Sequence, residues 1–154
     1  MRVKTDGDPF IYLDVPFTVD ILSCTITGHY ADTFDSVAIE PARTDMITEV
    51  NYIITAASTE AVFYFAFDDI VTAENNGCQT VYTQEYTLFV DDVDVTNTLP
   101  TWVSTFDPSV GELGIETTDE ALNNRVFTVT IKSAFVNELI READSFIQID
   151  LRLI

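Results

Sequence analysis

The chain has 154 residues, which is enough for one domain with its own hydrophobic core. Hydrophobic residues make up 47% of it, which argues against a disordered protein, although 26 acidic against 7 basic residues give a net charge of -19. This charge argues against nucleic acid as a partner and against an anionic membrane surface, because few cations are present to neutralise phosphates. No apolar segment approaches the ~20 residues that cross a bilayer, so we expect no direct membrane insertion.

The residue types favour strands over helices. Thr, Val, Ile, Phe and Tyr are frequent, and these side chains suit a pleated, half-buried surface. Short apolar or alternating segments predict strands at Phe10–Leu13, Phe17–Leu22, Val37–Ile39, Val50–Thr55, Ala61–Phe67, Val81–Val90, Glu112–Thr117, Val126–Phe135 and Ser145–Ile154. Helical periodicity is confined to Thr118–Asn123, a single turn, and to Val136–Ala143, a short amphipathic turn. Many short strands without a βαβ rhythm predict an all-β sandwich.

The two cysteines, Cys24 and Cys78, indicate the compartment. They are not part of a CxxC pair and His29 is the only histidine, so a zinc site has too few ligands. We favour one disulfide of a secreted protein, which would stabilise the folded state by roughly 4 kcal/mol by closing the loop between the two cysteines. The alternative is two buried thiols in a cytosolic protein. We therefore expect an extracellular or cell-surface location. His29 itself is expected in a surface turn without a nucleophile beside it.

A family resemblance lies in residues 99–113, which read LPTWVSTFDPSVGEL. Trp102 is expected to cap the core, residues 107–109 to form a tight turn, and Gly111 to free the backbone before the next strand. This segment resembles the central motif of dystroglycan-type cadherin-like domains, a branch of the Ig-like sandwiches. The residues that carry the resemblance are Leu99, Pro100, Trp102, Phe106, Asp107, Gly111 and Leu113. It extends through Ser133 and, more loosely, covers everything from Cys24, with one inserted residue near Thr105.

The resemblance implies a module of a multi-module protein. Surface proteins of ciliate type carry tandem copies of similar domains, so residues 1–23 are interpreted as the last strand of a preceding module or a strand given to a neighbour. Residues 24–154 then form the sandwich itself. Phe17–Leu22 has a pattern similar to that of Phe146–Leu151 near the C-terminus. The predicted interface residues are Phe10, Tyr12, Phe17, Val19 and Ile21.

Two groups of acidic residues are candidates for a functional site, one for calcium binding and one for catalysis. Asp91, Asp92 and Asp94 follow a predicted strand, and calcium takes roughly 6–8 oxygen ligands, so they are a possible calcium site. The alternative is a solvated acidic loop that discourages edge pairing. Glu112 and Glu116 share a strand face, as a glycosidase pair would, but among 26 acidic residues such pairs arise by chance. We expect no catalytic site and no cofactor apart from calcium.

Aromatic residues have two interpretations in this sequence. Phe63, Phe65 and Phe67 share one face of a predicted strand, which we expect to point into the core. An exposed sugar-binding platform would use Trp102, Tyr64, Tyr82 and Tyr86, although aromatics spaced by two are more often core. The sequence thus predicts a non-enzymatic structural module of a surface or filamentous assembly, joined to copies of itself or adjacent modules by strand addition or stacking. The alternative is a calcium-dependent adhesion or glycan-binding module.

Overall fold

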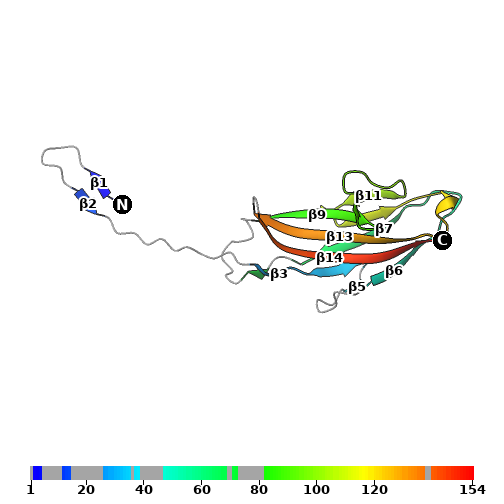
Figure 1. The fold of residues 1–154 in the computed structure, drawn as a ribbon, viewed down its shortest axis with the longest axis horizontal. Helices are drawn as coiled ribbons and strands as arrows, with labels where there is room; N and C mark the ends of the chain where they lie inside the picture. Colours follow the sequence, from blue (N-terminus) through cyan, green and yellow to red (C-terminus); the bar gives the residue numbers. More distant parts are fainter. Residues whose placement is uncertain are drawn as a thin grey trace.

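The computed structural model describes residues 2–4, 12–14, 26–35, 37–38, 47–68, 71–72, 82–137 and 140–154. Most of them lie in strands, and Figure 1 shows two sheets of these strands packed as a sandwich, which confirms the all-β prediction. The bounds are β1 Arg2–Lys4, β2 Tyr12–Asp14, β3 Ile26–Gly28, β4 Ala31–Phe34, β5 Val37–Ala38, β6 Ile47–Tyr52, β7 Ala61–Phe67, β8 Val71–Thr72, β9 Thr83–Val90, β10 Val93–Asp94, β11 Val103–Asp107, β12 Glu112–Ile115, β13 Val126–Asn137 and β14 Ile140–Leu153. Among the described residues, no helical segment has the length and hydropathy that a membrane span requires.

Two five-stranded sheets make up the sandwich. The first sheet has the order β10-β9-β13-β14-β6, and the second sheet has the order β11-β12-β7-β4-β5. The described pairs are antiparallel except for β14 with β6, which run parallel. β13 and β14 form the long hairpin at the centre of the first sheet, with β9 on one side and β6 on the other (Figure 1). β3 and β8 form a separate pair.

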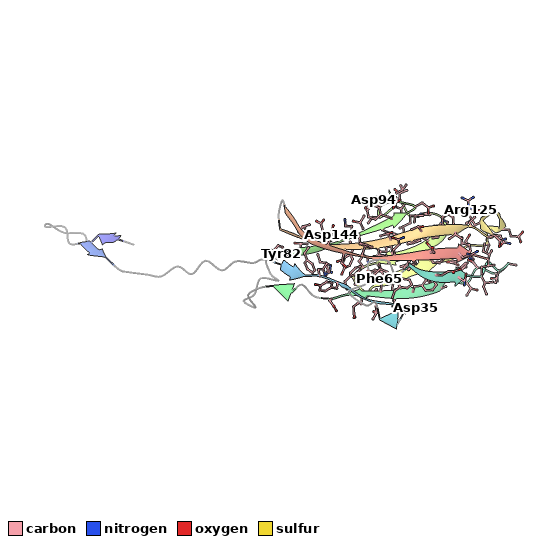
Figure 2. All side chains as sticks on the ribbon, turned by 60° about the horizontal axis from the view of Figure 1, so that its bottom comes forward. Asp35, Phe65, Tyr82, Asp94, Arg125 and Asp144 are labelled. Atoms are coloured by element: carbon pink, nitrogen blue, oxygen red, sulfur yellow. The ribbon has the colours of Figure 1, made fainter. Side chains whose placement is uncertain are left out.

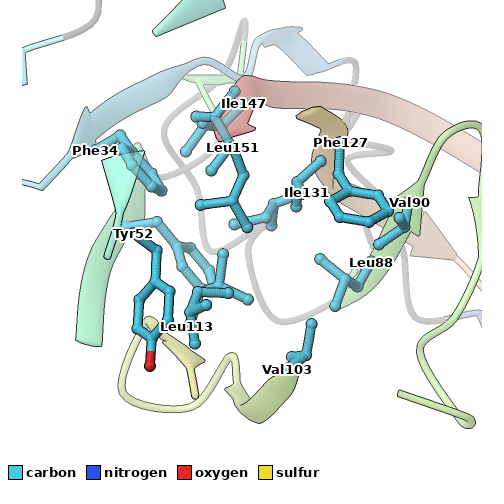
Figure 3. Packing of buried hydrophobic residues seen from close by; sticks show 14 of the residues in the cluster. Phe34, Tyr52, Leu88, Val90, Val103, Leu113, Phe127, Ile131, Ile147 and Leu151 are labelled. Atoms are coloured by element: carbon cyan, nitrogen blue, oxygen red, sulfur yellow. The ribbon is translucent and has the colours of Figure 1, made fainter. Parts of the chain in front are cut away.

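The core lies between the inner faces of the two sheets. Strand β14 alternates as a half-buried strand should, with Ile147, Ile149, Leu151 and Leu153 buried and the residues between them more exposed. Figure 3 shows the contact between layers: Leu88, Ile131 and Leu151 of the first sheet face Leu113 and Phe34 of the second. Phe65 is buried, and Phe63 and Phe67 pack against the same core. The predicted inward aromatic face of β7 is therefore confirmed.

One helical prediction is confirmed and the other is wrong. Within Thr118–Asn123, a 3-10 turn at Glu120–Leu122 is capped by Asp119, whose carboxylate accepts from the backbone N–H of Ala121 at 3.0 Å. Val136–Ala143 is not a helical turn, because β13 runs to Asn137 and β14 begins at Ile140. The register pairs Phe135 with Ala143 across this hairpin. Cross-strand hydrogen bonds to both neighbours of β13 outweigh a weak local helical pattern there.

The N-terminal strands form a two-stranded sheet of their own. Arg2, Val3 and Lys4 of β1 pair antiparallel with Asp14, Leu13 and Tyr12 of β2. The N-terminal segment predicted to be a strand without partners thus has a partner strand, β1, at Tyr12–Asp14. Four of the predicted interface residues and both cysteines lie outside the described residues: Phe10, Phe17, Val19, Ile21, Cys24 and Cys78. The proposed boundary at residue 23 and the disulfide stay predictions.

Candidate functional site

The motif around Trp102 builds the edge of the core. Trp102 is 5% exposed and stacks on Phe127 of β13, with ring centroids 4.7 Å apart. Phe106 of β11 stacks on Phe65 at 5.9 Å. The two residues at the start of the motif, Leu99 and Pro100, are half-buried, and Leu113 at its end is fully buried. The expectation that Trp102 caps the core is confirmed.

The turn inside this motif also has the predicted form. The Asp107 carboxylate accepts from the Ser109 hydroxyl at 2.6 Å and from the Ser109 backbone N–H at 2.9 Å, and these bonds hold the pKa of Asp107 below its usual value. Gly111 follows with φ +72°, and a Cβ there would collide with the backbone oxygen of Phe65. The Gly111 carbonyl accepts from the Phe65 N–H at 2.8 Å. The turn therefore fixes how β12 pairs with β7.

The aromatic residues considered as a sugar platform do not share a surface. Trp102 is buried, and Tyr86 packs between the sheets against Phe65 and Phe67. Tyr64 is 54% exposed, but it lies on the outer face of the second sheet. Trp102, Tyr64 and Tyr86 therefore form no common sugar-binding platform, and the preferred interpretation of such aromatics as core residues is confirmed for Trp102 and Tyr86.

The candidate calcium ligands sit at the β9–β10 hairpin. Asp91 and Asp92 have φ values of 48° and 64°, which is a two-residue turn with positive φ at both positions. The Asp91 carboxylate accepts from the Thr128 N–H at 2.9 Å. The Asp94 carboxylate accepts from the Thr96 N–H and hydroxyl at 3.0 and 2.8 Å, bonds that lower its pKa. Within the described residues, no three His, Cys, Asp or Glu side chains form a group suited to a metal ion.

His29 is buried, and the prediction of a surface turn is wrong. It is 5% exposed and lies between the rings of Phe67 and Phe135, at 5.7 and 4.8 Å. Its Nδ1 is 3.1 Å from the backbone oxygen of Asp68, and its Nε2 is 3.0 Å from the hydroxyl of Ser133. Because a carbonyl oxygen only accepts, Nδ1 carries the proton and Nε2 accepts from Ser133.

A polar cluster thus joins His29, which lies just before β4 of the second sheet, to Ser133, Gln84 and Tyr86 of the first sheet. Gln84 of β9 donates to the Ser133 hydroxyl at 2.8 Å, and the hydroxyl of Tyr86 bonds to both Ser133 and Gln84. Burial is the main effect on two groups: it lowers the pKa of His29 and raises that of Tyr86. Each buried polar atom has a partner, since no described buried side-chain nitrogen or oxygen is unsatisfied.

The contact between Ser133 and His29 has the atoms of a nucleophile and base, which the sequence analysis did not anticipate. Ser133 is 0% exposed and points between two packed sheets, so no substrate carbonyl could reach its hydroxyl. The second His29 nitrogen is oriented by a backbone carbonyl and not by a carboxylate. The geometry therefore indicates a structural role. Ser133 was detectable in principle, because it is a polar residue in the apolar register of β13.

A groove on the outer face of the first sheet is the other feature that the sequence analysis missed. It measures about 320 Å³ and is lined by Phe89, Asp92, Thr130, Lys132, Phe146 and Gln148. Phe146 is 46% exposed, an aromatic residue on the polar face of β14, and that mismatch is visible in the sequence. Neither a scan against family models nor searches of the curated proteins and of the solved structures found a match to this chain.

Proposed function

We propose that this chain is a non-enzymatic structural module of an extracellular surface or filamentous assembly. It associates with a neighbouring module by strand addition. The observation that carries the proposal is the edge of β9 at Thr83–Thr87, which no strand of the described residues covers and which we call the β9 edge. Open backbone groups at a sheet edge bind an extended segment by main-chain hydrogen bonds, and alternating side chains set the register.

The β9 edge begins where β10 stops. β10 pairs only with Val90 and Phe89, and the next residue, Leu88, accepts from the Val95 N–H at 2.9 Å and donates to the Thr96 hydroxyl at 2.9 Å. No described strand pairs with the remaining five residues on that side. Because backbone direction alternates along a strand, the N–H and C=O groups of Gln84 and Tyr86 point the same way as those of Leu88. They face away from β13.

This edge carries few of the features that normally block association. Thr83–Thr87 contains no proline and no lysine, and Glu85 is its one charged residue. Within the β9–β13 ladder its register runs without a shift. An added strand therefore meets a regular edge. We propose that the donated strand is Phe17–Leu22 of a neighbouring copy, whose alternating pattern resembles that of Phe146–Leu151 in β14.

Two variants at one position test the edge. Gln84→Pro removes the outward N–H and adds a ring that blocks strand addition, while edge strands tolerate proline in this orientation. Gln84→Ala is the matched control, because it removes the same side-chain bond to Ser133 but keeps the N–H. We expect light scattering to show assembly of the wild type and Gln84→Ala and only monomers of Gln84→Pro. Equal assembly of both variants would refute use of the β9 edge.

Deleting residues 1–23 tests the donor. The shortened chain should keep the thermal transition of the sandwich and lose assembly, because the donated strand is gone. Adding back a synthetic peptide of residues 15–23 should give binding to the shortened chain. Assembly that persists after the deletion would contradict the proposal, as would failure of the peptide to bind.

A further inference from the structure

The outer face of the first sheet carries a second candidate binding site, away from the β9 edge. Its register places Thr130 of β13 opposite Phe89 on one side and opposite Gln148 on the other. One step along the same face, Lys132 lies opposite Phe146. The two aromatic rings therefore lie diagonally across β13, with polar side chains between them. This is the lining of the groove of about 320 Å³.

Lys132 is held in place at this groove. Its ammonium group is 2.7 Å from the carboxylate of Asp144, the outward-facing residue two positions before Phe146 on β14. Figure 2 shows Asp144 near the end of the sandwich where Tyr82 also lies, with Arg125 at the opposite end. An ion pair restricts the rotamers of Lys132, so less ordering is needed when it donates to a ligand. The groove thus presents a fixed donor beside an exposed ring.

The lining selects the chemistry of the ligand. A purely apolar ligand would cover the hydrogen-bonding groups of Thr130 and Gln148 and leave them unpaired, which is unfavourable. An anionic ligand would approach a chain with a net charge of -19, with Asp92 at the groove itself. The remaining class is a small neutral ligand with an apolar face and a polar rim. A sugar ring has this form, since its C–H face stacks on aromatic rings while its hydroxyls donate and accept.

We infer that this groove binds a neutral saccharide, with Phe89 and Phe146 as stacking surfaces and Lys132, Thr130 and Gln148 as hydrogen-bonding groups. Its volume is at the small end of ligand pockets, which fits one or two sugar units. The site is independent of the strand-addition proposal, because it lies on the face of the sheet and not at its edge. Glycan binding would allow each module of an assembly to hold a carbohydrate surface.

The test is saturation-transfer NMR on the full chain with methyl glycosides of glucose, galactose, mannose and N-acetylglucosamine, followed by calorimetric titration of the best binder. Phe146→Ala removes an exposed stacking ring and Gln148→Leu removes an amide of similar size. Val126→Ala is the matched control, because Val126 is exposed on the same face of β13 but outside the groove. Circular dichroism melts check that each variant is folded.

We expect Phe146→Ala to weaken binding at least tenfold, Gln148→Leu by several fold, and Val126→Ala to leave the affinity unchanged. The transferred signal should be strongest on the C–H protons of one sugar face. Absence of transfer from all four glycosides to the wild type would overturn the inference. Equal binding by the wild type and folded Phe146→Ala would also overturn it, because the saccharide would then bind elsewhere. Neither result would bear on assembly by strand addition.

Discussion

Lowering the pH should reduce the free energy of unfolding by protonating His29, which bonds to Ser133 of the first sheet and to Asp68 next to β7 of the second sheet. In the folded protein the imidazole is neutral, with Nδ1–H donated to the Asp68 carbonyl and Nε2 accepting from Ser133. Burial lowers the pKa of His29 from its ordinary 6.5, and this effect exceeds the opposing influence of the Asp68 carbonyl and of the charges of Asp68 and Asp144. Protonation removes the acceptor that Ser133 uses.

The sign follows from proton linkage. Because the folded-state pKa lies below the unfolded-state value of 6.5, the unfolded chain binds more protons between the two. The contribution of His29 to the free energy of unfolding is therefore complete above the unfolded pKa and is lost as the pH falls toward the folded pKa. One group changes that free energy by at most about 1.4 kcal/mol per pH unit, which sets the steepest slope to expect.

The assay is urea unfolding of the wild type and of His29→Gln between about pH 8 and pH 5. Glutamine donates and accepts but does not titrate, so the difference between the two proteins isolates the histidine from the many carboxylates. At the upper end we expect His29→Gln to be less stable by about 1–3 kcal/mol, because one amide cannot satisfy both Asp68 and Ser133. As the pH falls below the pKa of His29 in the unfolded chain, the difference in the free energy of unfolding between the two proteins should decrease. Parallel stability curves over the whole range would refute the reasoning.

Two other predictions concern the turns of the sandwich. Gly111→Ala should lower the free energy of unfolding by about 2 kcal/mol or more, because an alanine at φ +72° is strained and its Cβ meets the Phe65 carbonyl; a thermal melt within error of the wild type would contradict this. Calcium and EDTA should leave the melting temperature unchanged, because the carboxylates of Asp91 and Asp94 already accept hydrogen bonds that shape the hairpin. A calcium-dependent rise in melting temperature would establish the alternative of a calcium site.

Local patterns predicted much of the architecture. The alternation of buried and exposed residues in β14 and the aromatic face of β7 could be predicted from the sequence. Successive side chains of a strand point to opposite faces, so a half-buried strand has apolar residues at every second position. The turn at Gly111 was readable for a similar reason, since few other residues tolerate that backbone angle. The same local reasoning failed at Val136–Ala143, where pairing across the hairpin decided the structure.

The sequence by itself therefore determined the fold class, the buried faces and the turn that follows Trp102. Only the tertiary structure decided which side chains meet. Ser133 contacts His29 across 104 positions of the chain, and the groove joins side chains of β9, β13 and β14 through their mutual register. Periodicity tells which way a side chain points, but strand order and register between distant segments set its neighbours, and these depend on packing the whole core at once.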